Sequence, residues 1–123
     1  MPNLKELNDA VSLMDQLQTN EDGSVVLINI FTIDPADEEA LIAAWTHDAD
    51  FMKAQPGYIS TQMHQAIAGS PTFLNYAVWE SVQSFRAAFT NPEFQARIAR
   101  YPDSATVSPY LFKKLAVAGH CVA

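Results

Sequence analysis

Two polar side chains, Asn75 and Trp79, interrupt an otherwise apolar stretch from Thr72 to Glu80. The stretch is rich in aromatic and β-branched residues, which predicts a β-strand. Because side chains alternate between the faces of a strand, Asn75 and Trp79 share one face with only the small Ala77 between them. This spacing predicts a pocket in which an amide and an indole N–H could bind a small molecule. The pattern alone is more typical of core residues whose polar atoms are satisfied within the protein.

The sequence lacks the motifs of several other familiar kinds of site. The four glycines are scattered, so there is no glycine-rich phosphate loop. His47, His64, His120 and Cys121 show no metal-ligand spacing, which predicts no metal site. No nucleophile-elbow motif is present. His64 could serve as a base in a pocket, although a structural histidine is the more common interpretation.

The bulk composition predicts one globular domain. Of 123 residues, 49% are apolar and 17% are charged, which is typical of a folded chain. The net charge of −7, without a run of Lys or Arg, argues against nucleic acid or an anionic membrane as a partner. No segment resembles a signal peptide or a membrane span. A single cysteine suits a reducing compartment, so we expect a cytoplasmic protein.

The first third of the chain contains a helix, a strand and a second helix by pattern. Apolar residues recur at helical spacing over residues 3–18, which predicts a helix within an N-terminal extension of residues 1–22. Residues 24–33 predict a strand that is apolar on both faces. Asn29 is its one strongly polar residue, and most buried asparagines are structural, a ligand contact being the minority interpretation. Asp34-Pro35 should begin a helix that extends to about residue 52, with Asp48 towards its outer side.

The remaining elements complete a familiar order. Strands are predicted over residues 58–65, 72–80 and 106–117, with two short helices beginning near Ser81 and Asn91. Over residues 23–117 this order predicts an α+β, ferredoxin-like βαββαβ domain, with a four-stranded antiparallel sheet and helices on one face. Residues 118–123 form a tail. The other sheet face is also apolar, and a second subunit is expected to cover it.

The segment Asn75-Tyr76-Ala77-Val78-Trp79-Glu80-Ser81, followed by Gln83-Ser84-Phe85-Arg86, resembles the antibiotic biosynthesis monooxygenase (ABM) family. Residues 26–34, Gln55-Pro56-Gly57-Tyr58 with His64 after it, and Asn91-Pro92-Glu93-Phe94 agree with the same family. The resemblance covers about residues 24–117. It implies a dimeric α+β barrel, in which the open sheet faces of two subunits pack together.

The resemblance also implies a site. Members of this family include anthrone oxygenases that use no metal, flavin or haem, and their functional asparagine and tryptophan fall on Asn75 and Trp79. An arginine after the second helix often assists in them. Arg97 is the nearest match, and Arg86 competes with it. The implied substrate-binding residues are Asn29, His64, Phe85 and Arg86, with Phe85 standing where some anthrone oxygenases have a tyrosine.

The function that the resemblance implies is a homodimeric, cofactor-independent monooxygenase that uses O₂ to oxidise a polycyclic phenol, an anthrone or a quinol. A quinol or signalling-molecule monooxygenase of the same fold is the enzymatic alternative. The non-enzymatic alternative is a dimeric small-molecule-binding or stress protein. The haem-degrading branch of the family shares Asn29 and Trp79 but needs an axial histidine near residues 94–99. Ile98 stands there, which argues against haem cleavage.

Overall fold

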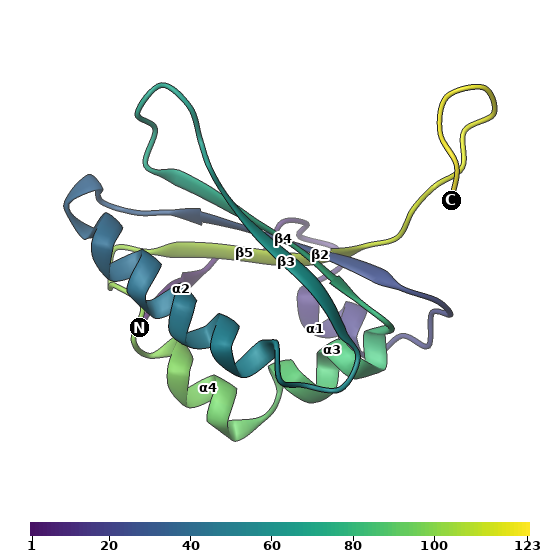
Figure 1. The fold of residues 1–123 in the computed structure, drawn as a ribbon, viewed down its shortest axis with the longest axis horizontal. Helices are drawn as coiled ribbons and strands as arrows, with labels where there is room; N and C mark the ends of the chain where they lie inside the picture. The colour runs from purple at the N-terminus through teal and green to yellow at the C-terminus, as the bar shows by residue number, and fades with distance from the viewer.

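The computed structural model describes all 123 residues as an α+β fold with helices on one face of a sheet (Figure 1). The sheet order is β1-β5-β2-β4-β3. Its strands are β1 (Asn3–Leu4), β2 (Val25–Thr32), β3 (Tyr58–Gln65), β4 (Thr72–Trp79) and β5 (Thr106–Phe112). The helices are α1 (Leu13–Leu17), the 3₁₀ turn η1 (Pro35–Asp37), α2 (Glu38–Met52), α3 (Val82–Phe89) and α4 (Pro92–Ile98). Strands β2 to β5 pair antiparallel in the predicted ferredoxin-like order, so the predicted fold class is confirmed.

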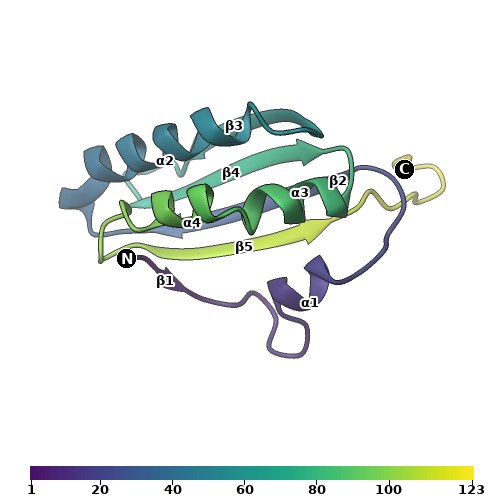
Figure 2. The same ribbon diagram turned by 90° about the horizontal axis from the view of Figure 1, so that it is seen from below.

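The central strands β2 and β4 place the two asparagines beside each other. Asn29 is paired with Asn75 across the β2–β4 ladder. On the same face of β4, Ala77 and Trp79 are buried at 3% and 1% exposure. Helices α2, α3 and α4 cover this face, whereas α1 lies near the β5 edge of the sheet (Figure 2). The asparagine pair therefore lies in the layer between the sheet and the helices.

The predicted helix over residues 3–18 is wrong for most of its length. Residues 3–4 form β1, which pairs in parallel with β5 and makes the sheet five-stranded rather than four-stranded. The helix begins only after Ser12, which forms a reciprocal capping box with Asp15. Upstream, the Asn8 side chain accepts hydrogen bonds from the backbone N–H groups of Ala10 and Val11, which closes a turn instead of a helix.

The last strand is shorter than predicted. β5 ends at Phe112, whose partner Val26 lies one residue from the beginning of β2. Only Val25 of β2 remains beyond this point, so residues 113–117 leave the sheet. They lead into an arm that extends from the body of the protein and is closed by a bridge between Val117 and Cys121 (Figure 1).

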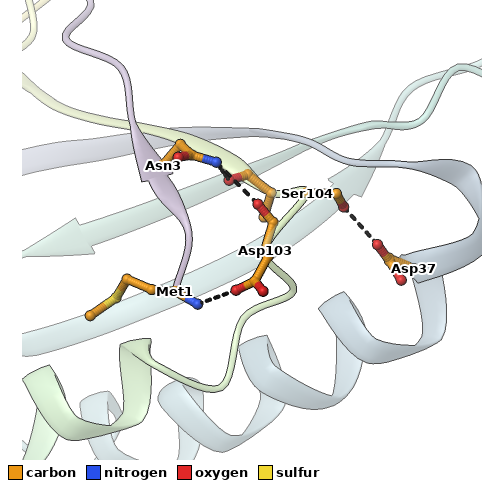
Figure 3. Close-up of polar contacts among 6 residues, drawn as sticks. Met1, Asn3, Asp37, Asp103 and Ser104 are labelled. Atoms are coloured by element: carbon orange, nitrogen blue, oxygen red, sulfur yellow. Dashed lines mark hydrogen bonds and ion pairs between the residues drawn. The ribbon is translucent and has the colours of Figure 1, made fainter.

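The N-terminal segment is fastened to the loop before β5 (Figure 3). The ammonium group of Met1 lies 2.6 Å from the carboxylate of Asp103, which holds the pKa of Asp103 below its usual range. The side-chain amide of Asn3 donates to the carbonyl of Asp103 at 3.1 Å. Ser104 donates to the carboxylate of Asp37 at 2.7 Å, which ties the same loop to the beginning of α2. These contacts hold the N-terminus at one end of the helical layer.

Gly57 precedes β3 and has a φ of +88°, in the left-handed region that glycine adopts without strain. A Cβ atom here would also overlap the side chain of Ser84 in α3. We expect Gly57→Ala to lower the free energy of unfolding by about 1–3 kcal/mol, measured by urea denaturation. Gly69→Ala is the matched control, because Gly69 has a φ of +72° and open space around it. Equal losses in the two variants would contradict a steric role for Gly57.

Candidate functional site

A cavity of about 340 Å³ lies between the helix-facing side of the sheet and the helices. This volume is in the range of small-molecule sites. Strands β2, β4, β3 and β5 contribute one wall, and helices α2, α3 and α4 contribute the opposite one. The sheet wall contains Leu27, Asn29, Phe31, Tyr58, Thr61, Asn75, Ala77, Trp79, Val107 and Pro109. The helix wall contains Trp45, Asp48, Ala49, Met52, Phe89, Phe94, Gln95 and Ile98, with Tyr101 beyond α4.

The Asn75 amide is held by a neighbouring strand. Its Oδ1 accepts a hydrogen bond of 2.6 Å from the hydroxyl of Thr61 on β3. With the oxygen occupied, the NH₂ group of Asn75 has no partner within the protein, although Asn75 lines the cavity. An amide fixed through its oxygen presents its N–H donors in a defined direction. Asn75 is therefore a preorganised hydrogen-bond donor at the cavity wall.

Asn29 is arranged in the same way on the adjacent strand. Its Oδ1 accepts a hydrogen bond of 3.1 Å from the backbone N–H of Ser108. Because a backbone N–H can only donate, this contact fixes which end of the amide is the acceptor. Asn29 thus has a structural role, because it ties β2 to β5 next to Pro109, which has no N–H of its own. Its NH₂ group is left without a protein partner beside that of Asn75.

Trp79 is held rigidly by aromatic neighbours. Its ring makes edge contacts with Tyr58 and with Phe85, each at 5.6 Å between ring centroids. The side chain is 1% exposed, and its indole N–H is buried without a hydrogen-bond partner. Buried polar groups are nearly always paired in folded proteins. The indole N–H is therefore a further unpaired donor in a residue that lines the cavity.

Asp48 is the only carboxylic acid in the cavity wall, and its predicted position was wrong. It was expected on the outer side of its helix, yet it is 6% exposed. Burial raises the pKa of Asp48 to about 6, and the Tyr101 hydroxyl and the charges of Arg97 and Arg100 only partly oppose this. The spacing Leu41, Trp45, Asp48 and Met52 follows one helical stripe, so the pattern contained the signal. The other unpredicted residues of the cavity wall include Thr61, which orients Asn75, and Tyr101.

The two arginines implied by the resemblance do not line the cavity. Arg97 donates to the carbonyl of His47 at 2.5 Å and pairs with Glu93 at 3.2 Å. Its guanidinium also lies 5.3 Å from the ring centre of Phe51, so it joins α4 to α2. Arg86 donates to the carbonyl of Leu17 at 2.8 Å, which satisfies a carbonyl at the end of α1. Both residues hold helices in place.

Phe85 and His64 also lie outside the cavity wall. Phe85 is 0% exposed and packs behind Trp79, so it positions that ring. His64 is exposed and sits in register with Leu74, on the sheet face opposite Asn75. A bulge between Tyr58 and Ser60 explains how Tyr58, Thr61 and Met63 all face the helices. Strict alternation along residues 58–65 would place Tyr58 on the same face as His64, and the bulge is the reason that it does not.

Comparison with known proteins identifies the family. A model of the family "Antibiotic biosynthesis monooxygenase" matches residues 24–100, so the chain belongs to this family. A search of curated proteins found no match. Among solved structures, a candidate monooxygenase from Shewanella loihica PV-4 is 30% identical, covers 80% of this chain and 100% of its own length, and has a TM-score of 0.68.

Two further solved structures show the same fold. SnoaB, a cofactor-independent oxygenase from Streptomyces nogalater, is 24% identical with a TM-score of 0.67, over 80% of this chain and 99% of its own. Rv0793 from Mycobacterium tuberculosis is 18% identical with a TM-score of 0.63, over 78% of this chain and 99% of its own. Separately, none of the helices has both the length and the apolar character needed to cross a bilayer.

Proposed function

We propose that this protein is a cofactor-independent monooxygenase that uses O₂ to oxidise an anthrone, a polycyclic phenol or a quinol. The observation that carries the proposal is the pair of oriented amides, Asn29 and Asn75, in the wall of an aromatic-lined cavity. Family membership and the description of SnoaB as a cofactor-independent oxygenase support it. The wall contains no histidine, and Ile98 contributes to it from α4. An axial imidazole for haem is therefore lacking, and haem cleavage is not proposed.

The proposed chemistry needs no external reductant. An anthrone first loses a C–H proton and becomes an electron-rich enolate, which can pass an electron to O₂. In the overall reaction the CH₂ group becomes C=O, one oxygen atom enters the product and the other leaves as water. The N–H donors of Asn75 and Asn29 would stabilise the enolate oxygen, where negative charge develops. The Trp79 ring would hold the flat substrate, and its N–H could bind a reduced oxygen species.

Oxygen uptake tests this proposal. Protein treated with a chelator and dialysed is added to anthrone in an oxygen electrode. We expect saturable, protein-dependent O₂ uptake well above the spontaneous oxidation of anthrone, with a heat-denatured sample as the control. A rate no higher than that of the control, across anthrone, polycyclic phenol and quinol substrates, would contradict the proposal. In that case, saturable quenching of tryptophan fluorescence by anthraquinone would favour the non-enzymatic binding protein.

We also propose that the protein is a homodimer, joined through the uncovered face of its sheet. Apolar residues on that face remain partly exposed, with Tyr76 at 41% and Phe112 at 43%. We expect a dimer in analytical ultracentrifugation at micromolar concentration, and Tyr76→Glu should shift it to a monomer because it would bury a charge. Ile42→Glu, at a residue that is 39% exposed on α2, is the matched control. A monomeric wild-type protein would contradict this association.

A further inference from the structure

The cavity wall contains one carboxylic acid, Asp48, to which neither the sequence nor the resemblance gives a role. Asp48 belongs to the α2 wall, whereas the asparagine pair belongs to the sheet wall of the same cavity. Its Oδ1 is buried and has no hydrogen-bond partner. A buried carboxylate oxygen without a partner is costly for folding, and Asp48 lines the cavity, so this residue is a candidate for a role with a ligand.

We propose that the carboxylate of Asp48 is the base that removes the C–H proton of the bound substrate. This inference rests on the proposed function, because it names the proton acceptor for the enolate that O₂ then oxidises. In this step the substrate C–H bond breaks and an O–H bond forms on Asp48. The electron pair stays on the substrate, where the carbonyl oxygen becomes the enolate oxygen bound by Asn75. Nothing is oxidised or reduced until O₂ reacts.

The surroundings of Asp48 suit a base that works near neutral pH. Burial raises its pKa to about 6, which makes the carboxylate more basic than an exposed one while leaving it largely ionised at pH 7 to 8. The Tyr101 hydroxyl and the positive charges of Arg97 and Arg100 act in the opposite direction and lower this pKa. Burial and the Asp48 charge raise the pKa of Tyr101, so this hydroxyl stays protonated as a donor.

The other polar groups of the cavity are weaker candidates than Asp48 for the proton acceptor. The sheet wall offers the neutral amides of Asn29 and Asn75 and the phenol of Tyr58. At the N-terminal end, the Met1 ammonium is already paired with Asp103. Glu93 is paired with Arg97, and neither lines the cavity. Among the groups in the wall, the Asp48 carboxylate is therefore the one that can accept a proton near neutral pH.

Hydrogen exchange of anthrone tests the proton step without O₂. Anthrone is incubated with protein in anaerobic D₂O, and loss of the CH₂ signal is followed by NMR. We expect the wild-type protein to accelerate exchange and Asp48→Asn, which is neutral and nearly isosteric, to lose about 10²-fold or more of this rate. The wild-type exchange rate should fall as the pH drops through about 6, since the base becomes protonated, and Asp48→Asn should lack this limb.

A second variant, Asp48→Ala, tests the role of Asp48 even where Asp48→Asn fails to fold. Asp48→Ala leaves space for a small carboxylic acid, and added formate should restore exchange in it but not in Asn75→Ala. Wild-type exchange that Asp48→Asn leaves unchanged would overturn the role of Asp48 alone. Accelerated O₂ uptake without accelerated exchange would do the same and leave the monooxygenase in place. Accelerated exchange that Asp48→Asn loses, without O₂ uptake, would overturn the monooxygenase but support Asp48. Absence of both exchange and O₂ uptake would overturn both proposals.

Discussion

Asn75→Ala is expected to lower kcat for anthrone oxidation by about 10²–10³-fold, the usual loss when one oxyanion donor is removed. Its amide oxygen is occupied by Thr61, so the donor that the variant loses is the NH₂ group at the cavity wall. The donor acts mainly where charge develops, and for that reason KM should change much less than kcat. Initial rates of O₂ uptake at several anthrone concentrations separate the two parameters.

The control for this prediction is Asn20→Ala. Asn20 is exposed between α1 and β2 and does not line the cavity, so its removal should leave both kcat and KM unchanged. Thermal unfolding of Asn75→Ala shows whether the fold is intact. A folded Asn75→Ala protein with wild-type kcat would remove the oxyanion role from Asn75. Asn29 would then be left as the remaining oriented asparagine of the sheet wall.

Phe85→Ala is expected to lower the free energy of unfolding by about 3–5 kcal/mol, which is typical for a fully buried phenylalanine. Phe85 is 0% exposed and packs against Trp79 and Phe89 at 5.6 and 5.5 Å between ring centroids. Its loss would leave a cavity behind the Trp79 ring. Urea denaturation measures the effect. Ile67→Ala, at a residue that is 89% exposed, is the control and should change stability by no more than about 0.5 kcal/mol.

This prediction also separates packing from substrate contact. Because Phe85 does not line the cavity, we expect the conservative Phe85→Leu variant to fold and to keep a KM for anthrone close to that of the wild-type protein. A large increase in KM with unchanged stability would instead support the direct substrate contact that the resemblance implies. Wild-type stability of Phe85→Ala would contradict its place in the core.

The sequence predicts the layer architecture because its two central strands are strongly patterned. The segment Thr72 to Trp79 is rich in aromatic and β-branched residues, and the structure places Asn75, Ala77 and Trp79 on the helix face, as the two-residue period of a strand predicts. The cap at Asp34 and the proline that follows it also begin the helical region as expected. These features are local, so a single sequence is enough to predict them.

The features that the sequence did not predict depend on distant or irregular contacts. The bulge near Tyr58 changes which β3 side chains face the helices, and no residue type in the strand signals it. Leu4 and Leu7 fit a helical stripe, yet they are 56% and 50% exposed. Leu4 pairs with β5 instead, and the helix begins only after its cap at Ser12. Arg97 is the nearest match to an assisting arginine, but it binds the His47 carbonyl and Glu93 and does not line the cavity.

Isotope labelling with ¹⁸O₂ distinguishes a monooxygenase from a protein that does not transfer oxygen to its substrate. Anthrone is oxidised with and without the protein, and the product is analysed by mass spectrometry while O₂ and H₂O₂ are quantified. A monooxygenase should show protein-dependent formation of a product with one ¹⁸O atom, one O₂ consumed per product molecule and no accumulation of H₂O₂. Protein-dependent turnover with an unlabelled product and stoichiometric H₂O₂, or product formation at the protein-free rate, would contradict the account.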